Sequence, residues 1–129
     1  MRAEDRAEIE AAGFAVRHML IRLWRQSIEP RCALVDGEVA ACWGDEAGLL
    51  ADVGVMWLFT APPVARLPLA FFREGRAEIA RRLQTRRIII SDIAEGYDAA
   101  LRFFRLLGAQ ISEPILAPSG ARYCRMTLG

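Results

Sequence analysis

The residues with the clearest chemical potential follow a buried strand, in the stretch WLFTAPPVARLPLAFFREG from Trp57 to Gly75. This stretch reads as a strand that ends at Thr60, a joint marked by prolines, and then a helix. The free N–H groups at the start of a helix bind anions, so strand-to-helix joints often hold a phosphate. Such joints are usually rich in glycine, whereas this one has no glycine between Thr60 and Arg73. Two alternatives follow: a phosphate site, or a site that has lost its ligand.

Other residue types that do chemistry are scarce. All seventeen basic residues are arginine, so no lysine is present to form a Schiff base or to act as a catalytic ammonium. Arginine suits phosphate, although a GC-rich genome also explains its frequency. His18 is the only histidine, and no CxxC pair is present, so no metal site is expected. The three scattered cysteines fit a reducing cytoplasm; they are Cys32, Cys42 and Cys124.

The size and composition of the chain predict one globular domain over residues 1–129. Hydrophobic residues make up 53% of the chain and charged residues 26%, as in folded soluble proteins. The net charge of +1 gives no general attraction to nucleic acid or to an anionic membrane. No apolar run approaches the length of a membrane span, and the charged N-terminus does not resemble a signal peptide. We therefore expect a cytoplasmic protein with no nucleic-acid or membrane partner.

The hydrophobic pattern predicts the order α, α, β, β, β, α, β, α, β, β. The first half is expected to form helices over 3–12 and 14–27, ended by Pro30, then a hairpin over 32–43 around Asp36-Gly37, a loop over 44–48 and an interior strand over 53–60. The second half is expected to form a helix from Leu67 to Leu83, a strand over 87–92, a helix over 97–108 and two strands, 111–116 and 122–128, around the turn 117–120. Pro68 suits the first turn of its helix. Pro114 places its strand near a sheet edge or a bulge.

This order, together with several short motifs, resembles the GNAT acyltransferase superfamily. The segments MRAEDRAEIEA, LVDGEVAACWG and AALRFFRLLGAQI are similar to the family's first helix, hairpin and closing helix. The segment GVMWLFTAPPV, with PLAFFREGR after it, is similar to a diverged, phage-encoded branch of the family. The resemblance implies an α+β (α/β/α) fold: a mixed, mostly antiparallel sheet with helices on both faces and the first strand reduced or missing. It also implies that the strand over 53–60 parts from its neighbour, leaving a gap for a thioester.

The resemblance further implies acetyl-CoA as the cofactor. The family carries Q/R-x-x-G-x-G/A after this strand, and the corresponding place here is Arg66 to Ala70, with Pro68 near the central glycine. Proline has no N–H, and one lost charged hydrogen bond costs about 1.5–3 kcal/mol. The cofactor-binding residues that the resemblance implies are Phe59, Thr60, Arg66, Leu67, Leu69 and Ala70.

The family's usual acid and base have no obvious counterparts. Counting back four residues from Gly108, where many members have tyrosine, gives Phe104, which has no proton to donate; Tyr97 lies about two turns earlier. No carboxylate occurs between Val53 and Thr60. The nearest acidic residues are expected on flanking loops; they are Asp45, Glu46 and Asp52. The catalytic residues are therefore left unassigned.

Two functions remain open. The first is an N-acyltransferase that moves an acetyl group from acetyl-CoA to an unknown small-molecule or protein amine. The second is a non-catalytic GNAT-like binding or structural module of phage or prophage origin, which the proline joint and Phe104 favour. The Pro114 strand and the C-terminal hairpin could pair across a homodimer.

Overall fold

The computed structural model describes residues 2–11, 16–47 and 52–129. Its helices are α1 (Ala3–Ala11), α2 (Val16–Gln26), the 3-10 helix η1 (Pro62–Arg66), α3 (Pro68–Arg82) and α4 (Asp98–Leu106). Its strands are β1 (Ile28–Val35), β2 (Glu38–Ala47), β3 (Val53–Thr60), β4 (Ile88–Ala94), β5 (Gln110–Ile111), β6 (Ile115–Leu116) and β7 (Arg122–Leu128). None of the helices in these ranges is long and apolar enough to cross a bilayer.

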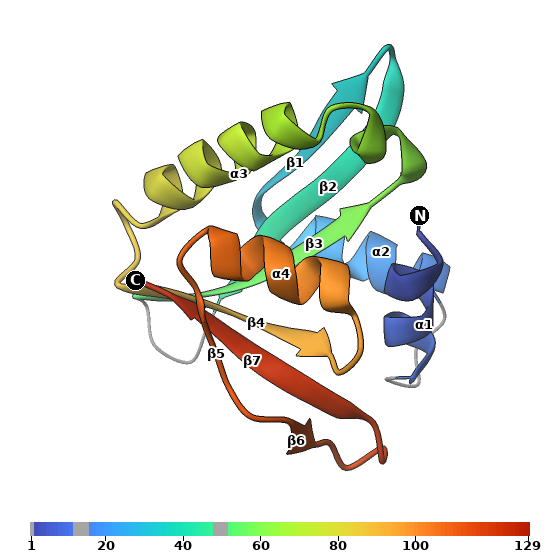
Figure 1. The fold of residues 1–129 in the computed structure, drawn as a ribbon, viewed down its shortest axis with the longest axis vertical. Coiled ribbons are helices and arrows are strands. Elements are labelled where there is room, and N and C mark those ends of the chain that lie inside the picture. Colours follow the sequence, from blue (N-terminus) through green and yellow to red (C-terminus); the bar gives the residue numbers. More distant parts are fainter. Residues whose placement is uncertain (1, 12–15, 48–51) are drawn as a thin grey trace.

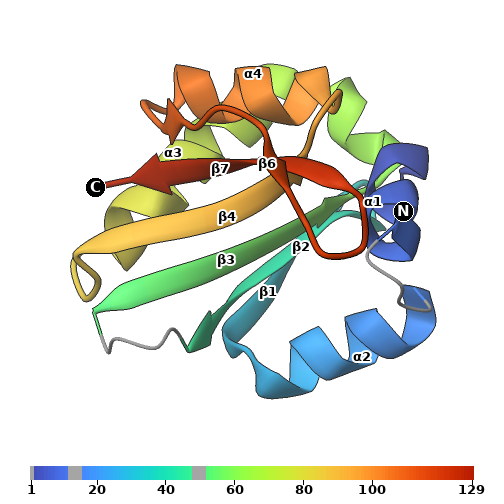
Figure 2. The same cartoon turned by 90° about the horizontal axis from the view of Figure 1, so that it is seen from below.

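The strands form one open sheet, and its topology confirms the expected fold class. The strand order is β1-β2-β3-β4-β7-β5, with β6 also pairing with β7. All neighbouring strands are antiparallel except β3 and β4, which are parallel. Helices α3 and α4 cover one face of the sheet and α2 lies on the other (Figures 1 and 2). The first element of the described chain is α1.

The first hairpin forms as predicted, but its strands are longer than expected. Asp36 and Gly37 both have positive φ, 51° and 79°, as a type I′ turn requires. Residues 44–47, expected as loop, belong to β2 and pair with β3 as far as Gly54. Gly44 permits this pairing, because a Cβ there would lie 2.9 Å from the Trp57 ring.

Two prolines, Pro30 and Pro114, lie in or between edge strands of the sheet. Helix α2 ends at Gln26, before Pro30, and Pro30 lies in β1. Since β1 is an edge strand, the absence of an N–H on Pro30 costs the sheet no hydrogen bond. The expected strand over 111–116 is two short strands, β5 and β6, separated at Pro114; both pair with β7, which confirms the edge position.

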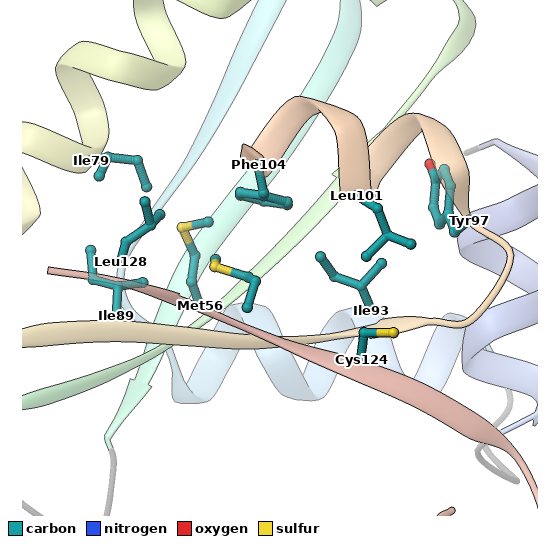
Figure 3. Packing of buried hydrophobic residues seen from close by; sticks show 10 residues of the cluster. Met56, Ile79, Ile89, Ile93, Tyr97, Leu101, Phe104, Cys124 and Leu128 are labelled. Atoms are coloured by element: carbon teal, nitrogen blue, oxygen red, sulfur yellow. The ribbon is translucent and has the colours of Figure 1, made fainter. Parts of the chain in front are cut away.

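The main core lies between α4 and the strands β3, β4 and β7. Leu101 and Phe104 on α4 are 7% and 4% exposed, and Figure 3 shows strand side chains such as Ile93 directed toward them. Helix α4 begins at Asp98, directly after the buried Tyr97, and ends before Gly108, whose φ is 94°. This packing fixes α4 above the part of the sheet where β3 and β4 meet.

Candidate functional site

Strands β3 and β4 pair over three positions and then part. The paired residues are Val53 with Ile88, Gly54 with Ile89 and Val55 with Ile90. Beyond them β3 continues to Thr60 and β4 to Ala94 without pairing with each other. The expected gap is therefore present.

A cavity of about 650 Å³ occupies this gap. Every β3 residue from Val55 to Thr60 lines it. Helices from both faces of the sheet also contribute, with Leu23 from α2 and Ala100 from α4 among the lining residues. The cavity therefore passes through the sheet, and its size is typical of a small-molecule site.

The backbone of β3 alternates between its two neighbours. The Ala61 N–H donates to the Ala40 carbonyl on the β2 side, whereas the Thr60 N–H donates to Asp5 of α1 and the Thr60 carbonyl accepts from Arg2, just before α1. Because successive residues of a strand direct their N–H and C=O groups to opposite sides, both backbone groups of Leu58 and the C=O of Met56 point into the gap. The Met56 N–H faces β4 at the last paired position, Val55 with Ile90. Polar backbone groups in such a place need a partner, either water or a ligand.

The open end of the gap is held by Asp5 of α1 and by Arg2, which precedes α1. Asp5 Oδ2 accepts two hydrogen bonds from Thr60, one from its N–H at 2.9 Å and one from its hydroxyl at 3.2 Å. The Arg2 N–H donates to the Thr60 carbonyl at 2.9 Å. Asp5, although acidic, is only 3% exposed. Thr60 thus lines the cavity, as expected, but its backbone is already engaged.

Tyr97, directly before α4, lies at the same end of the gap. Burial, followed by the charge of Asp5, raises the pKa of the Tyr97 phenol to about 12. The phenol therefore keeps its proton at neutral pH. Tyr97 and Phe104 both line the cavity and belong to the core, with Leu101 between them along α4 (Figure 3). Phe104 itself has no proton to donate, as the sequence indicated.

The start of α3 offers fewer phosphate donors than a glycine loop. Pro68 and Phe71 line the cavity; Pro68 has no N–H, and the Phe71 N–H donates to the Leu67 carbonyl at 2.9 Å. The Leu67 N–H is bonded to the Val64 carbonyl at 3.4 Å. The remaining N–H groups are those of Leu69 and Ala70 in the first turn of α3, before its first internal hydrogen bond.

Of the six residues expected to bind the cofactor, two line the cavity. Phe59 and Thr60 do so, while Arg66, Leu67, Leu69 and Ala70 lie just outside it, between or next to the lining residues Ala65, Pro68 and Phe71. The guanidinium of Arg66 is 3.5 Å from the Glu38 carboxylate, and both side chains are more than half exposed. Such an exposed pair is weak and can be exchanged for a phosphate.

The three acidic residues near β3 have separate roles. Asp45 is fully buried and forms ion pairs with Arg82 and Arg86. Asp52 is exposed, and its hydrogen bond with Arg87 lowers the pKa of its carboxyl group. Glu46 lines the cavity, opposite Val55, where β3 and β4 separate. Of the three, Glu46 alone is placed to receive a proton in the gap.

Two features of the site were not predicted from the sequence. The first feature is Asp5: it lies in the first predicted helix, and no local pattern indicates that it reaches Thr60. The second feature, the unpaired Met56 C=O and Leu58 backbone, depends on where β4 leaves β3, which an apolar run does not specify. In the described ranges no group of three His, Cys, Asp or Glu side chains could hold a metal ion.

Comparison with known proteins supports the fold. No protein-family model matches the chain, and no curated protein matches its sequence. Among solved structures, a GNAT-family acetyltransferase from Streptococcus pneumoniae superposes with a TM-score of 0.64 at 14% identity, over 89% of this chain and 76% of that one. The aminoglycoside acetyltransferase AAC(6')-Ib in complex with coenzyme A gives 0.61 at 17%, over 82% and 68%. RimL, the ribosomal L7/L12 alpha-N-protein acetyltransferase in complex with coenzyme A, gives 0.65 at 7%, over 88% and 68%. At these identities the likeness shows that the chain has the GNAT fold.

Proposed function

We propose that this protein is an N-acyltransferase that moves an acyl group, in the simplest case acetyl, from acetyl-CoA to an amine. The single observation that carries the proposal is the gap between β3 and β4, which contains a cavity of about 650 Å³. Parting two interior strands leaves hydrogen-bonding groups unpaired, which is costly unless a ligand or water satisfies them. Solved structures of the same fold contain coenzyme A.

The extended pantetheine arm of the coenzyme suits this gap. Its two amide groups can pair with the C=O of Met56 and the backbone of Leu58 as a short additional strand would. Phe59 and Thr60 would border the arm. The coenzyme's phosphates would lie against the N–H groups of Leu69 and Ala70, beside Leu67, with Arg66 released from Glu38 to supply charge. The missing N–H of Pro68 weakens this site without removing it.

Transfer requires the amine to attack the thioester carbonyl carbon while the C–S bond breaks and the thiolate leaves. We propose that Glu46, where the strands separate, accepts the proton that the amine loses, directly or through one water. A positioned base contributes about 10²–10⁴-fold in rate. Holding the amine against the thioester supplies about 7–11 kcal/mol of barrier lowering, so a dedicated acid is not required.

The acceptor is proposed only as an amine. One protein with this fold was solved with kanamycin and coenzyme A, and another is a ribosomal protein acetyltransferase. A small-molecule and a protein acceptor are therefore both represented among the similar structures. A homodimer, a cytoplasmic location and a phage origin stay predictions from the sequence.

Thermal melting tests the proposal directly. A ligand at one hundred times its dissociation constant stabilises a protein by about 2.7 kcal/mol, which raises the melting temperature of a chain of this size by about 10 °C. Millimolar acetyl-CoA should produce such a shift. A protein that melts at the same temperature with and without the coenzyme would refute the proposal.

Two matched variants locate the site. Ala99 is exposed and lines the cavity, so Ala99→Trp should block the gap and abolish the shift. Ala77 on α3 is also exposed but does not line the cavity, so Ala77→Trp should retain the shift. A shift that survives Ala99→Trp would place the coenzyme elsewhere.

The second candidate is a GNAT-like module that does not turn over. The proline at the start of α3 and the engaged backbone of Thr60 favour it. Glu46→Gln decides between the two once coenzyme binding is established. An enzyme should lose rate at least a hundredfold and keep the melting shift; a module shows no transfer in either form.

A further inference from the structure

A second cavity of about 510 Å³ lies beside the first. Its lining residues come from α3, α4 and strands β1 to β3, and the two helices lie on the same face of the sheet (Figure 1). Both cavities are lined by the same five apolar residues, namely Met56, Leu58, Phe71, Phe103 and Phe104. The boundary between the two spaces is therefore apolar and formed from β3, α3 and α4.

Aromatic rings form most of this boundary. Phe71 stacks on Phe103 with 5.0 Å between ring centroids, and Phe103 meets Phe104 at 5.3 Å. Gly75 makes the arrangement possible, because a Cβ at that position would lie 3.0 Å from Phe103 Cζ. The helix thus leaves room for the ring at the junction of the two cavities.

The charged groups around the second cavity include a partnered pair. Arg31 Nη1 lies 3.4 Å from Glu78 Oε2, and Glu78 Oε1 accepts a hydrogen bond from Trp43 Nε1 at 3.0 Å. Glu74 is the third charged residue, and it is exposed. The part that adjoins the first cavity is apolar, so the space there suits an uncharged aliphatic group.

We propose that the second cavity receives the acyl chain of a thioester longer than acetyl-CoA. Met56 lines both spaces and is the first β3 residue beyond the pairs with β4. A thioester held beside Met56 in the gap can therefore direct an unbranched aliphatic chain toward the aromatic junction and into the space under α3. This inference rests on the proposed function and specifies its donor substrate.

A chain-length series tests the inference separately from the function. Each buried methylene increases affinity about fourfold. Calorimetric titration with free coenzyme A and its acetyl, butanoyl, hexanoyl and octanoyl thioesters should show hexanoyl-CoA binding at least tenfold more tightly than acetyl-CoA. Equal affinities across the thioesters would overturn the inference and leave the proposed function intact. If neither free coenzyme A nor any thioester binds, the proposed function fails as well.

A cavity-filling variant tests the location of the chain. Ala33 lines only the second cavity. It points toward α3 because Arg31, two residues earlier on the same strand, reaches Glu78 of α3. Ala33→Leu should reduce the hexanoyl-CoA affinity to that of acetyl-CoA and leave the affinity for free coenzyme A unchanged.

Ala77→Leu adds the same atoms on the exposed side of α3 and should leave the whole series unchanged. A hexanoyl preference that persists in Ala33→Leu would place the chain outside this cavity and overturn the inference. If Ala33→Leu does not fold, the chain-length series on the unmodified protein decides by itself.

Discussion

The buried carboxylate of Asp45 tests how much the ion pairs beside the gap contribute to the free energy of unfolding. It lies between the guanidinium groups of Arg82 and Arg86. The side chains of Asp45 and Arg82 are each 1% exposed. Asp45→Asn preserves the shape of the side chain and removes its charge, which leaves Arg82 buried with one fewer anion.

The magnitude follows from the burial. Removing one partner of a buried ion pair costs about 3–5 kcal/mol. Arg82 keeps its bonds to Glu78 at 2.7 Å and to the Glu29 carbonyl at 3.2 Å, so the lower half of that range is expected. For 129 residues the entropy of unfolding is about 0.27 kcal/mol/K, which converts 3–4 kcal/mol into a fall in melting temperature of about 11–15 °C.

The assay is urea and thermal unfolding at pH 7, with Asp52→Asn as the matched control. Asp52 forms its ion pair with Arg87 in solvent, and the two side chains are 52% and 61% exposed. Its substitution should leave the unfolding curve nearly unchanged. Equal effects of the two substitutions, or a loss below about 1 kcal/mol for Asp45→Asn, would refute the claim that this buried cluster stabilises the fold.

Three further predictions concern the gap and the strand beside it. Tyr97 has a pKa of about 12 in the folded protein against 10.0 ordinarily. Its neutral form therefore adds stability that is fully present below pH 10 and is lost as the pH rises toward 12. Ultraviolet titration should show a phenol that ionises near pH 12, and Tyr97→Phe should remove that step. Asp5→Ala should cost about 1.5–3 kcal/mol in urea unfolding, because the buried Thr60 N–H loses its charged acceptor; an unchanged midpoint would contradict that bond. Gly44→Ala should cost about 1–3 kcal/mol, because the new methyl group would collide with the Trp57 ring; an unaltered melting temperature would mean that the ring moves freely.

The elements of the fold were predictable because each carries a local signal. The Asp36-Gly37 turn, the apolar strand over 53–60 and the change to helical spacing after Leu67 all depend on residues close in sequence. The errors arose where the outcome depends on distant residues. Residues 44–47 extend β2 because they pair with β3. The sequence of the segment itself does not indicate this pairing.

The site was predictable only in outline. The resemblance placed the gap beside Phe59 and Thr60, and both line the cavity. It did not distinguish a free backbone from an engaged one, because the bond from Thr60 to Asp5 joins residues far apart in the chain. Likewise Asp45 and Glu46 are neighbours in sequence, yet one is buried among arginines and the other lines the cavity.

The gap between β3 and β4 is fixed at both ends. Three residue pairs join the strands at one end, and at the other Asp5 bonds Thr60, beside Tyr97. Fixing both ends keeps the gap at one width before any ligand binds. The entropy of ordering the gap is then lost during folding, so a molecule that enters it meets a preorganised receptor and retains more of its interaction energy as affinity.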